Sequence, residues 1–353
     1  MAKTKILYIV ESFSTGVYSI IRDIACNLDK SKFEVLIVHS LRDDSPKDID
    51  KDFSQSNIIL KYVPMGNKKE YLRAIKIIKN IIKEFNPDVY HVHSSKGGFL
   101  GRLAIKGKKN KVFYTPHGLS YVRTDVNSFT KWIFFQLEYW INKFTPSRII
   151  AVSNSENQNA LKITKNVVVI NNFINLDEYE ESLSNAKGPI VACGRITEAR
   201  NPLLFNSIAK RFPDEKFLWV GDGPLNKLLD SPNISITGLL PRVEAIQEVK
   251  KAKIYLQTSL WEGMPVALLE AMALGKPVIA SNIIGNRDLV IDKVNGYLCS
   301  VTDIEEFIAK INSALKDSKL RDDLGLAARA HIKENHNVTK AIKLYESEYL
   351  STY

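Results

Sequence analysis

The stretch from Ser259 to Ser281 restricts the fold of this chain most, because it encodes a loop, a helix, a sharp stop and a strand in succession. Gly263 gives the loop conformational freedom, and Pro265 suits the first position of a helix, where its missing N–H costs nothing. Residues 266–274 are good helix formers that end at a glycine, and residues 277–280 form a short β-branched run. The stretch therefore predicts one helix–strand unit of an α/β domain.

Two glutamates flank the start of this predicted helix. The helix is apolar all round except for Glu270, and a carboxylate buried on most sides needs a partner because an unpaired buried charge is costly. Glu262 lies eight positions earlier, on the loop. The backbone N–H groups of Gly263, Met264 and Val266 would point into the same space, which is typical of an anion site. The combination suits a nucleotide sugar, with N–H donors for the diphosphate and carboxylates for the hydroxyl groups.

The whole string E-G-M-P-x-x-x-L-E-A-M-A-x-G-x-P-V-I-A, which contains Glu262 and Glu270, resembles the signature of the family 4 retaining glycosyltransferases. Two glutamates at this spacing alone would indicate only a surface loop and a core helix with one solvated carboxylate. The resemblance implies an α/β protein of the GT-B fold, with two Rossmann-like domains facing each other across a cleft. It covers nearly the whole chain and is strongest over residues 190–290.

Length and composition fit such a two-domain protein. The chain has 353 residues, of which 45% are hydrophobic and 25% charged. It contains no run of eighteen apolar residues, which predicts no spanning helix, and its first apolar run is too short for a secretory signal. The three cysteines are far apart, so they indicate neither a disulfide framework nor a zinc site and favour a reducing cytoplasm.

The charge is unevenly distributed along the chain. Residues 1–170 hold 27 Lys and Arg against 15 Asp and Glu, whereas residues 171–353 hold 22 against 24. The basic first half predicts contact with an anionic surface or acceptor. Residues 68–85 read as an amphipathic helix, whose basic face is either simply solvated or in contact with anionic lipid headgroups. This face carries Lys69, Arg73, Lys76, Lys79 and Lys83.

A second helix, predicted over Ser128–Phe144, carries apolar and aromatic residues almost all round. The pattern favours a buried core helix. The alternative is that part of the helix docks into a membrane interface, where Trp and Tyr side chains are favoured.

The first domain begins with two strands, residues 5–10 and 33–38, around a helix, which predicts a parallel sheet. The first turn contains only Gly16, so it lacks the G-x-G-x-x-G pattern of a dinucleotide-binding dehydrogenase. The resemblance implies that this turn lies near the donor phosphates and the acceptor. His117 follows a strand directly, where open α/β sheets place their sites, and the resemblance implies that it faces the transferred sugar. His91 and His93 fit a packing role.

In the second domain, Arg195 and Arg200 lie five positions apart across a turn and can reach one anion. Two solvated arginines are the simpler interpretation, but the resemblance implies contact of both with the β-phosphate of the donor. It further implies that Gly221 and Gly223 form a donor-side turn and that Leu239 lies by the nucleobase. The chain is expected to divide into residues 1–171, with a returning helix 338–353, and residues 172–337.

The resemblance implies a metal-independent, retaining transferase that needs no cofactor and moves a hexose or N-acetylhexosamine from a nucleotide sugar, most simply a UDP-sugar. The expected partners are a lipid-linked or saccharide acceptor and an anionic membrane surface, with no nucleic acid. The expected location is cytoplasmic and peripheral, at the inner face of the plasma membrane, during capsule, O-antigen or exopolysaccharide synthesis. A nucleotide-sugar 2-epimerase and a non-catalytic nucleotide-sugar sensor are the alternatives. The expected catalytic residues are His117, Arg195, Arg200 and Glu262, and the expected donor-binding residues are Gly16, Gly221, Gly223, Leu239, Gly263, Met264, Pro265, Val266 and Glu270.

Overall fold

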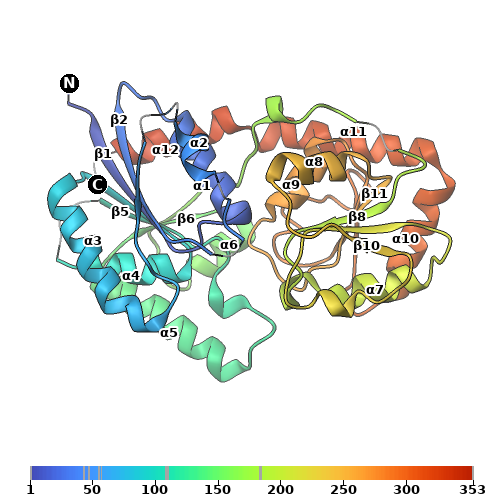
Figure 1. The fold of residues 1–353 in the computed structure, drawn as a ribbon, viewed down its shortest axis with the longest axis horizontal. Coiled ribbons are helices and arrows are strands. Elements are labelled where there is room, and N and C mark those ends of the chain that lie inside the picture. The colour runs from blue at the N-terminus through green and yellow to red at the C-terminus, as the bar shows by residue number, and fades with distance from the viewer. Residues whose placement is uncertain are drawn as a thin grey trace. The chain divides into compact units, whose positions relative to one another are not determined.

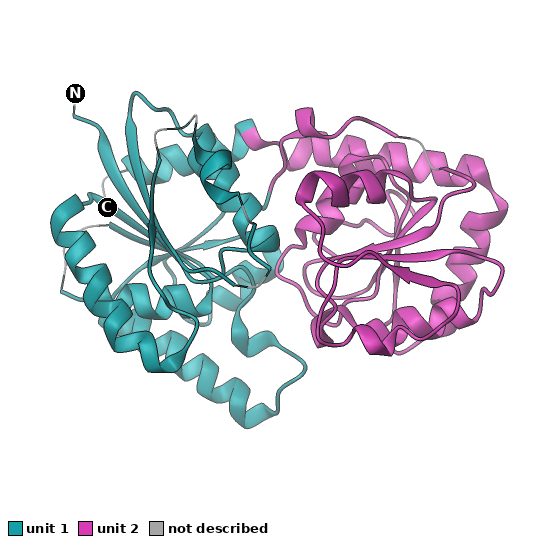
Figure 2. Cartoon of the chain, in the orientation of Figure 1, with its two compact units in different colours: residues 1–172, 339–353 teal, residues 173–338 magenta. Residues whose placement is uncertain are grey.

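The computed structural model describes residues 2–42, 44–46, 48–54, 56, 58–107, 111–182 and 185–351. The chain forms two compact units (Figure 2). Unit 1 comprises residues 1–172 and 339–353, and unit 2 comprises residues 173–338. Each junction lies one residue beyond the position expected from the sequence.

Unit 1 contains a seven-stranded sheet in the order β3-β2-β1-β4-β5-β6-β7, in which every pair of neighbouring strands is parallel. The strands are β1 (Thr4–Val10), β2 (Phe33–His39), β3 (Ile59–Tyr62), β4 (Val89–His93), β5 (Lys111–Thr115), β6 (Arg148–Ala151) and β7 (Val167–Val169). The helices are α1 (Thr15–Asn27), α2 (Ile49–Phe53), α3 (Tyr71–Phe85), α4 (Ser95–Ile105), α5 (Ser128–Phe144), α6 (Asn154–Ala160) and α12 (Val338–Leu350).

Alternating side chains of β1 show how this sheet is covered on both faces. Leu7 and Ile9 belong to an apolar core that α3 and α4 complete. Tyr8 points to the other face, where its hydroxyl group lies 3.1 Å from the Tyr349 hydroxyl of α12. The last helix of the chain therefore packs on the first strand, and α3, α4 and α5 follow one another across the opposite face (Figure 1).

Unit 2 contains a six-stranded parallel sheet in the order β10-β9-β8-β11-β12-β13. Its strands are β8 (Ile190–Cys193), β9 (Phe217–Val220), β10 (Ile234–Ile236), β11 (Ile254–Gln257), β12 (Val278–Ser281) and β13 (Tyr297–Cys299). Its helices are α7 (Pro202–Lys210), α8 (Arg242–Lys250), α9 (Val266–Ala273), α10 (Ile304–Lys316) and α11 (Ser318–Asn335). Helices α7, α10 and α11 complete one apolar core with this sheet.

Helix α5 differs from the buried core helix that its sequence favoured. Only Glu138, Ile141 and Asn142 are buried in it, and six of its large apolar side chains are exposed. The buried interpretation is therefore wrong for most of the helix, because one narrow stripe is enough to hold it on the unit. Helix α3 is amphipathic as expected, with Ile78, Ile82 and other apolar residues buried. Within the described ranges, no helix has the length and apolarity that a membrane span requires.

Candidate active site

In unit 2 the loops that follow β8 and β11 lie at the same edge of the sheet, because these parallel strands are neighbours. The strand order reverses its direction between β8 and β11. Such a switch point, at the carboxyl ends of the strands, is where open α/β sheets bind their ligands. The loop after β8 carries Arg195 and Arg200, and the loop after β11 carries Glu262.

Arg200 and Glu262 form an ion pair across these two loops, with 2.8 Å between Nη1 and Oε1. The same Oε1 accepts hydrogen bonds from the Ser259 hydroxyl group at 2.8 Å and from Nε2 of Gln257 at 3.2 Å. Burial lowers the pKa of Arg200, but Glu262, Tyr255 and Cys193 together more than offset this effect, so the pKa is raised. Arg200 therefore stays positively charged. Its partner Glu262 is in turn fixed through Oε1, which also accepts from Ser259 and Gln257.

Arg195 lies on the same loop but differs in its surroundings. It is exposed, whereas Arg200 is only partly exposed. The guanidinium of Arg200 lies against Gly194, where an added Cβ would come within 3.3 Å of the guanidinium carbon. Sequence reasoning treated the two arginines alike, whereas in the structure Arg200 pairs with Glu262 of the neighbouring loop and Arg195 is the more exposed of the two.

The predicted glycine turn after β9 packs directly on the loop after β8. A Cβ at Gly221 would lie 2.3 Å from the Gly194 carbonyl oxygen, and a Cβ at Gly223 would lie 2.3 Å from that of Ile196. Nε1 of Trp219 donates to the Gly194 carbonyl at 2.8 Å. Both glycines are therefore required by the close approach of two backbones, which fixes the shape of the loop that carries the arginines.

Glu270 has the partners that its burial demanded. Its Oε1 accepts from Nε of Arg242 at 3.0 Å and from the Tyr179 hydroxyl group at 3.1 Å. Arg242 also donates to the Tyr179 hydroxyl oxygen and, at 3.4 Å, to Glu178. Burial, followed by the Glu270 charge, raises the pKa of Tyr179, so its hydroxyl group stays protonated and remains a donor.

Sequence reasoning missed Arg242 and Tyr179. It predicted that Glu270 needs a partner, but these partners lie 28 and 91 positions away in the chain. Arg242 begins α8 three residues after Leu239, which is 56% exposed. Arg242 therefore connects the segment expected beside the nucleobase to the carboxylate expected to bind the ribose.

The start of α9 differs in detail from the expectation. Pro265 is the residue before the helix, with an extended backbone, and Val266 is the first helical residue. Gly263 and Met264, which the sequence places at the donor phosphates, precede the helix on this loop, and each also interacts within the chain. Gly285 has a φ of +88°, and a Cβ there would lie 2.7 Å from the Gly263 carbonyl oxygen. The loop around Gly285 therefore presses on the Glu262–Gly263 segment.

In unit 1, His117 follows β5 in a left-handed conformation, with a φ of +55°. The next residue is held by Glu156, whose Oε1 accepts from the Gly118 N–H at 2.7 Å and whose Oε2 accepts from the Val152 N–H at 2.8 Å. Burial lowers the pKa of His117 to about 4, so the imidazole is neutral at pH 7. A neutral ring can donate one hydrogen bond and accept another.

The other two histidines of this region have different partners. His91 lies 2.8 Å from the Thr115 hydroxyl oxygen and 2.7 Å from that of Tyr349, which fits its expected packing role. Nδ1 of His93 lies 3.1 Å from Nε2 of His117. His93 is therefore a direct neighbour of the candidate histidine, which the packing interpretation did not include.

Gly16 lies in the first turn of α1, because the helix begins at Thr15, whereas the sequence predicted a loop there. A charged cluster that sequence reasoning missed lies at the end of the preceding strand. Glu11, which is 2% exposed, lies 2.5 Å from Nη2 of Arg42 and 3.5 Å from Nζ of Lys96. The order of the sheet also changes direction here, between β1 and β4.

The two parallel sheets define a protein of the GT-B class, as solved structures show. The chain resembles sucrose-phosphate synthase from Thermosynechococcus elongatus with a TM-score of 0.83, at 17% identity over 99% of this chain and 98% of that one. It resembles HepE of Anabaena, solved with UDP-glucose, with a TM-score of 0.81, at 18% identity over 98% of each chain.

Two family models match consecutive parts of the chain. The model "Glycosyltransferase Family 4" matches residues 14–178, and the model "Glycosyl transferases group 1" matches residues 180–331. The chain therefore belongs to glycosyltransferase family 4. A curated relative, the UDP-Gal:alpha-D-GlcNAc-diphosphoundecaprenol alpha-1,3-galactosyltransferase of Escherichia coli, is 29% identical over 309 residues, which are 79% of each chain.

Proposed function

We propose that this glycosyltransferase moves a hexose or N-acetylhexosamine from a UDP-sugar to a lipid-linked or saccharide acceptor in the synthesis of a cell-surface polysaccharide. The observation that carries the proposal is the pair of glutamates in unit 2. Glu262 and Glu270 are each held by several donors that converge on Oε1, an arrangement suited to offering the other oxygen to hydroxyl groups of a ligand.

The names of similar proteins support the choice of donor and acceptor. HepE was solved with UDP-glucose and with UDP, and the E. coli relative is named for UDP-galactose and a diphosphoundecaprenol-linked sugar. A further structural neighbour is the lipopolysaccharide outer core galactosyltransferase WaaB, at 20% identity and a TM-score of 0.69. A lipid-linked acceptor would place the enzyme on the cytoplasmic face of the plasma membrane, as a peripheral protein.

We assign the residues of unit 2 to the donor. Arg200, with Arg195, stabilises the negative charge that grows on the leaving diphosphate. The N-terminus of α9, including Val266, contributes the positive end of its dipole. Glu270 accepts from the ribose hydroxyl groups, and Glu262 accepts from those of the sugar. Neutral His117 of unit 1 is suited to a single hydrogen bond with a sugar hydroxyl group.

The proposed reaction retains the anomeric configuration. The acceptor oxygen attacks the anomeric carbon from the face that the diphosphate leaves, so one C–O bond forms as the bond to the phosphate oxygen breaks. The electron pair of the broken bond goes to that phosphate oxygen, which also takes the proton of the acceptor hydroxyl group. The arginine charges stabilise this oxygen while it carries the developing charge, and we propose that no divalent metal or other cofactor takes part.

Incubation of the purified protein with a panel of nucleotide sugars and a membrane extract tests this function. We expect release of UDP from one donor, an α-linked sugar on the extracted acceptor, and the same activity after chelation with EDTA. A free epimerised sugar without a glycoside would instead identify an epimerase. Tight donor binding without any turnover would identify a sensor, and loss of activity with EDTA would contradict the metal-independent mechanism.

A further inference from the structure

Helix α5 presents one continuous apolar face outward. Its six exposed large apolar side chains have exposed fractions between 36% and 67%. Their spacing of three and four residues places them on a single side of the helix. Isolated exposed apolar residues are common, but a large contiguous patch marks an interaction site. The outer face consists of Phe129, Trp132, Ile133, Leu137, Trp140 and Phe144.

The inner side of α5 holds the helix in place without help from this outer face. Glu138 accepts from Nη2 of Arg102 at 2.7 Å and from the Tyr114 hydroxyl group at 2.8 Å. The buried Asn142 side chain accepts from the Ser147 hydroxyl group at 2.8 Å. The outer face is therefore not needed to seat the helix, and its aromatic rings are exposed.

Within α5 the charged side chains other than the inward Glu138 are lysines. Glu138 is the single acidic residue among the seventeen of α5, and it points inward to Arg102. Lys143 is exposed, and Nζ of Lys106 lies 5.3 Å from the centre of the Phe144 ring. The neighbouring helix α4 packs against both α5 and α3, whose Lys76 and Lys79 are exposed as well. A surface of this charge complements an anionic partner.

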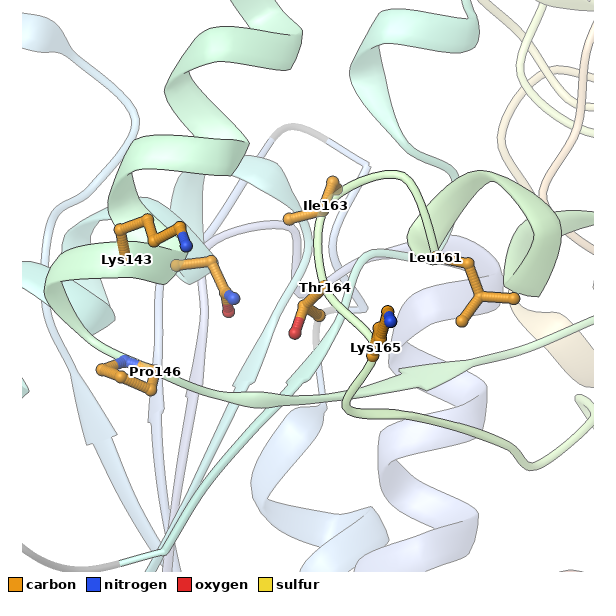
Figure 3. A pocket seen from close by; sticks show the side chains of 7 residues that line it. Lys143, Pro146, Leu161, Ile163, Thr164 and Lys165 are labelled. Atoms are coloured by element: carbon orange, nitrogen blue, oxygen red, sulfur yellow. The ribbon is translucent and has the colours of Figure 1, made fainter.

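A hollow of about 430 Å³ lies where α5 ends. Figure 3 shows Lys143 entering it from the side of α5 and Lys165 lying on the opposite side, with Thr164 between them. The exposed Leu161 also lines it. Two ammonium groups beside a hydroxyl group are suited to a phosphate group, as found in lipid headgroups.

We infer that the outer face of α5, together with this hollow, is a docking surface for an anionic lipid bilayer. The aromatic and aliphatic side chains enter the boundary between headgroups and acyl chains, where Trp is favoured, and the lysines contact the phosphates. This inference extends the proposed function, because it names the surface that contacts the membrane of a lipid-linked acceptor. It rests on the proposed function only for the choice of a bilayer as the anionic partner.

Co-sedimentation with vesicles tests the surface. The probes are vesicles of phosphatidylcholine alone and vesicles with 30% phosphatidylglycerol added, each at rising salt. The parent chain should bind the anionic vesicles, with a salt-resistant part that comes from the apolar face. The variant Trp132→Ser/Trp140→Ser/Phe144→Ser should lose binding at least tenfold, including the salt-resistant part. Lys143→Glu/Lys165→Glu should lose mainly the preference for anionic vesicles.

The matched control removes equally exposed apolar side chains from unit 2. Leu203→Ser/Ile291→Ser/Leu326→Ser should bind vesicles like the parent. All variants should melt within a few degrees of the parent, since none of the changed side chains is buried. In the parent, tryptophan fluorescence should shift to the blue on binding and be quenched by lipids brominated on their acyl chains.

Three results would overturn the inference. The first is that the triple aromatic variant binds vesicles as well as the parent does. The second is that the parent binds neutral and anionic vesicles equally. The third is a parent dimer in sedimentation equilibrium that the same variant abolishes without a change in vesicle binding, which would make the face a contact between two copies. UDP-sugar hydrolysis in solution is measured in parallel, so failure of the proposed function is distinguished from failure of docking.

Discussion

At the scale of single residues, the site of unit 2 consists of carboxylates held on one oxygen by unequal sets of donors. Glu262 is held by an arginine, a hydroxyl group and an amide, and Glu270 by an arginine and a tyrosine. Because the two glutamates have different partners, substitutions at Glu262 and at Glu270 should have different effects on binding.

Replacement of Arg200 by Ala should lower kcat at least a hundredfold, because it removes charge stabilisation worth about 3 kcal/mol in comparable cases. Arg195→Ala should lower kcat as well, with little change in the melting temperature because Arg195 is exposed. Steady-state kinetics on the identified donor, with thermal melting as the control for folding, checks both. Activity of both variants within a few-fold of the parent would remove the phosphate assignment.

The two glutamates should separate in binding experiments. Glu270→Gln should weaken UDP binding, whereas Glu262→Gln should leave UDP binding intact and impair use of the whole sugar donor. Arg242→Ala should reproduce the Glu270→Gln effect, because it releases the Glu270 side chain without touching Glu262. Isothermal calorimetry with UDP and with the UDP-sugar measures the difference. Equal losses of UDP affinity in the two glutamate variants would show that they do not bind separate parts of the donor.

His117 predicts how stability depends on pH. The pKa of His117 in the folded chain is about 4, below that of an exposed histidine, so folding favours the neutral ring. This contribution to stability is complete above about pH 6.5 and declines as the pH falls toward 4, because the unfolded chain then binds more protons. His117→Asn should therefore show a shallower fall of the melting temperature between pH 7 and pH 4.5. A slope identical to that of the parent would contradict the buried neutral state.

At the scale of elements, close backbone contacts decide which turns tolerate change. Gly223→Ala should destabilise the chain by about 1–3 kcal/mol and weaken UDP binding, because its Cβ would lie 2.3 Å from a backbone oxygen that cannot move aside alone. Gly66→Ala is the matched control, since a Cβ there has no atom within 4 Å among the described residues. Denaturant melts and calorimetry compare the two. A Gly223→Ala variant as stable as the control would mean that the turn shifts freely.

The elements also show what the sequence could predict. Buried β-branched runs such as the one in β12 identify a parallel sheet, because both faces of such strands are covered. The string around Glu270 predicted the edge of the candidate site, because its motif is continuous in sequence. Arg242 and Tyr179 could not be found this way, because only folding brings them to Glu270. Because apolar residues lie almost all round α5, its sequence does not show which side packs inward. In the structure, the ion pair between Glu138 and Arg102 fixes the inward side.

At the scale of the whole molecule, α12 belongs to unit 1, the same unit that contains β1. Removal of residues 339–353 should lower the melting temperature of unit 1 while UDP binding persists, because α12 packs on β1 and the residues proposed to bind the donor lie in unit 2. Calorimetric melting with and without UDP checks this. Tyr349→Phe, which loses its contacts with His91 and Tyr8, is the milder variant and should cost about 1–3 kcal/mol, because buried polar groups are left unsatisfied. Loss of UDP binding on truncation would show that α12 also supports unit 2.

The return of α12 has a consequence for synthesis on the ribosome. Domains usually fold in the order in which they are made. Here unit 2, residues 173–338, is an insertion within unit 1, and all of it is synthesised before residues 339–353. Tyr8 and His91 therefore have no partner Tyr349 until unit 2 has been synthesised. Unit 1 can therefore be completed only after unit 2 has been synthesised, so a nascent chain stalled near residue 338 contains the sequence of unit 2 but lacks α12 of unit 1.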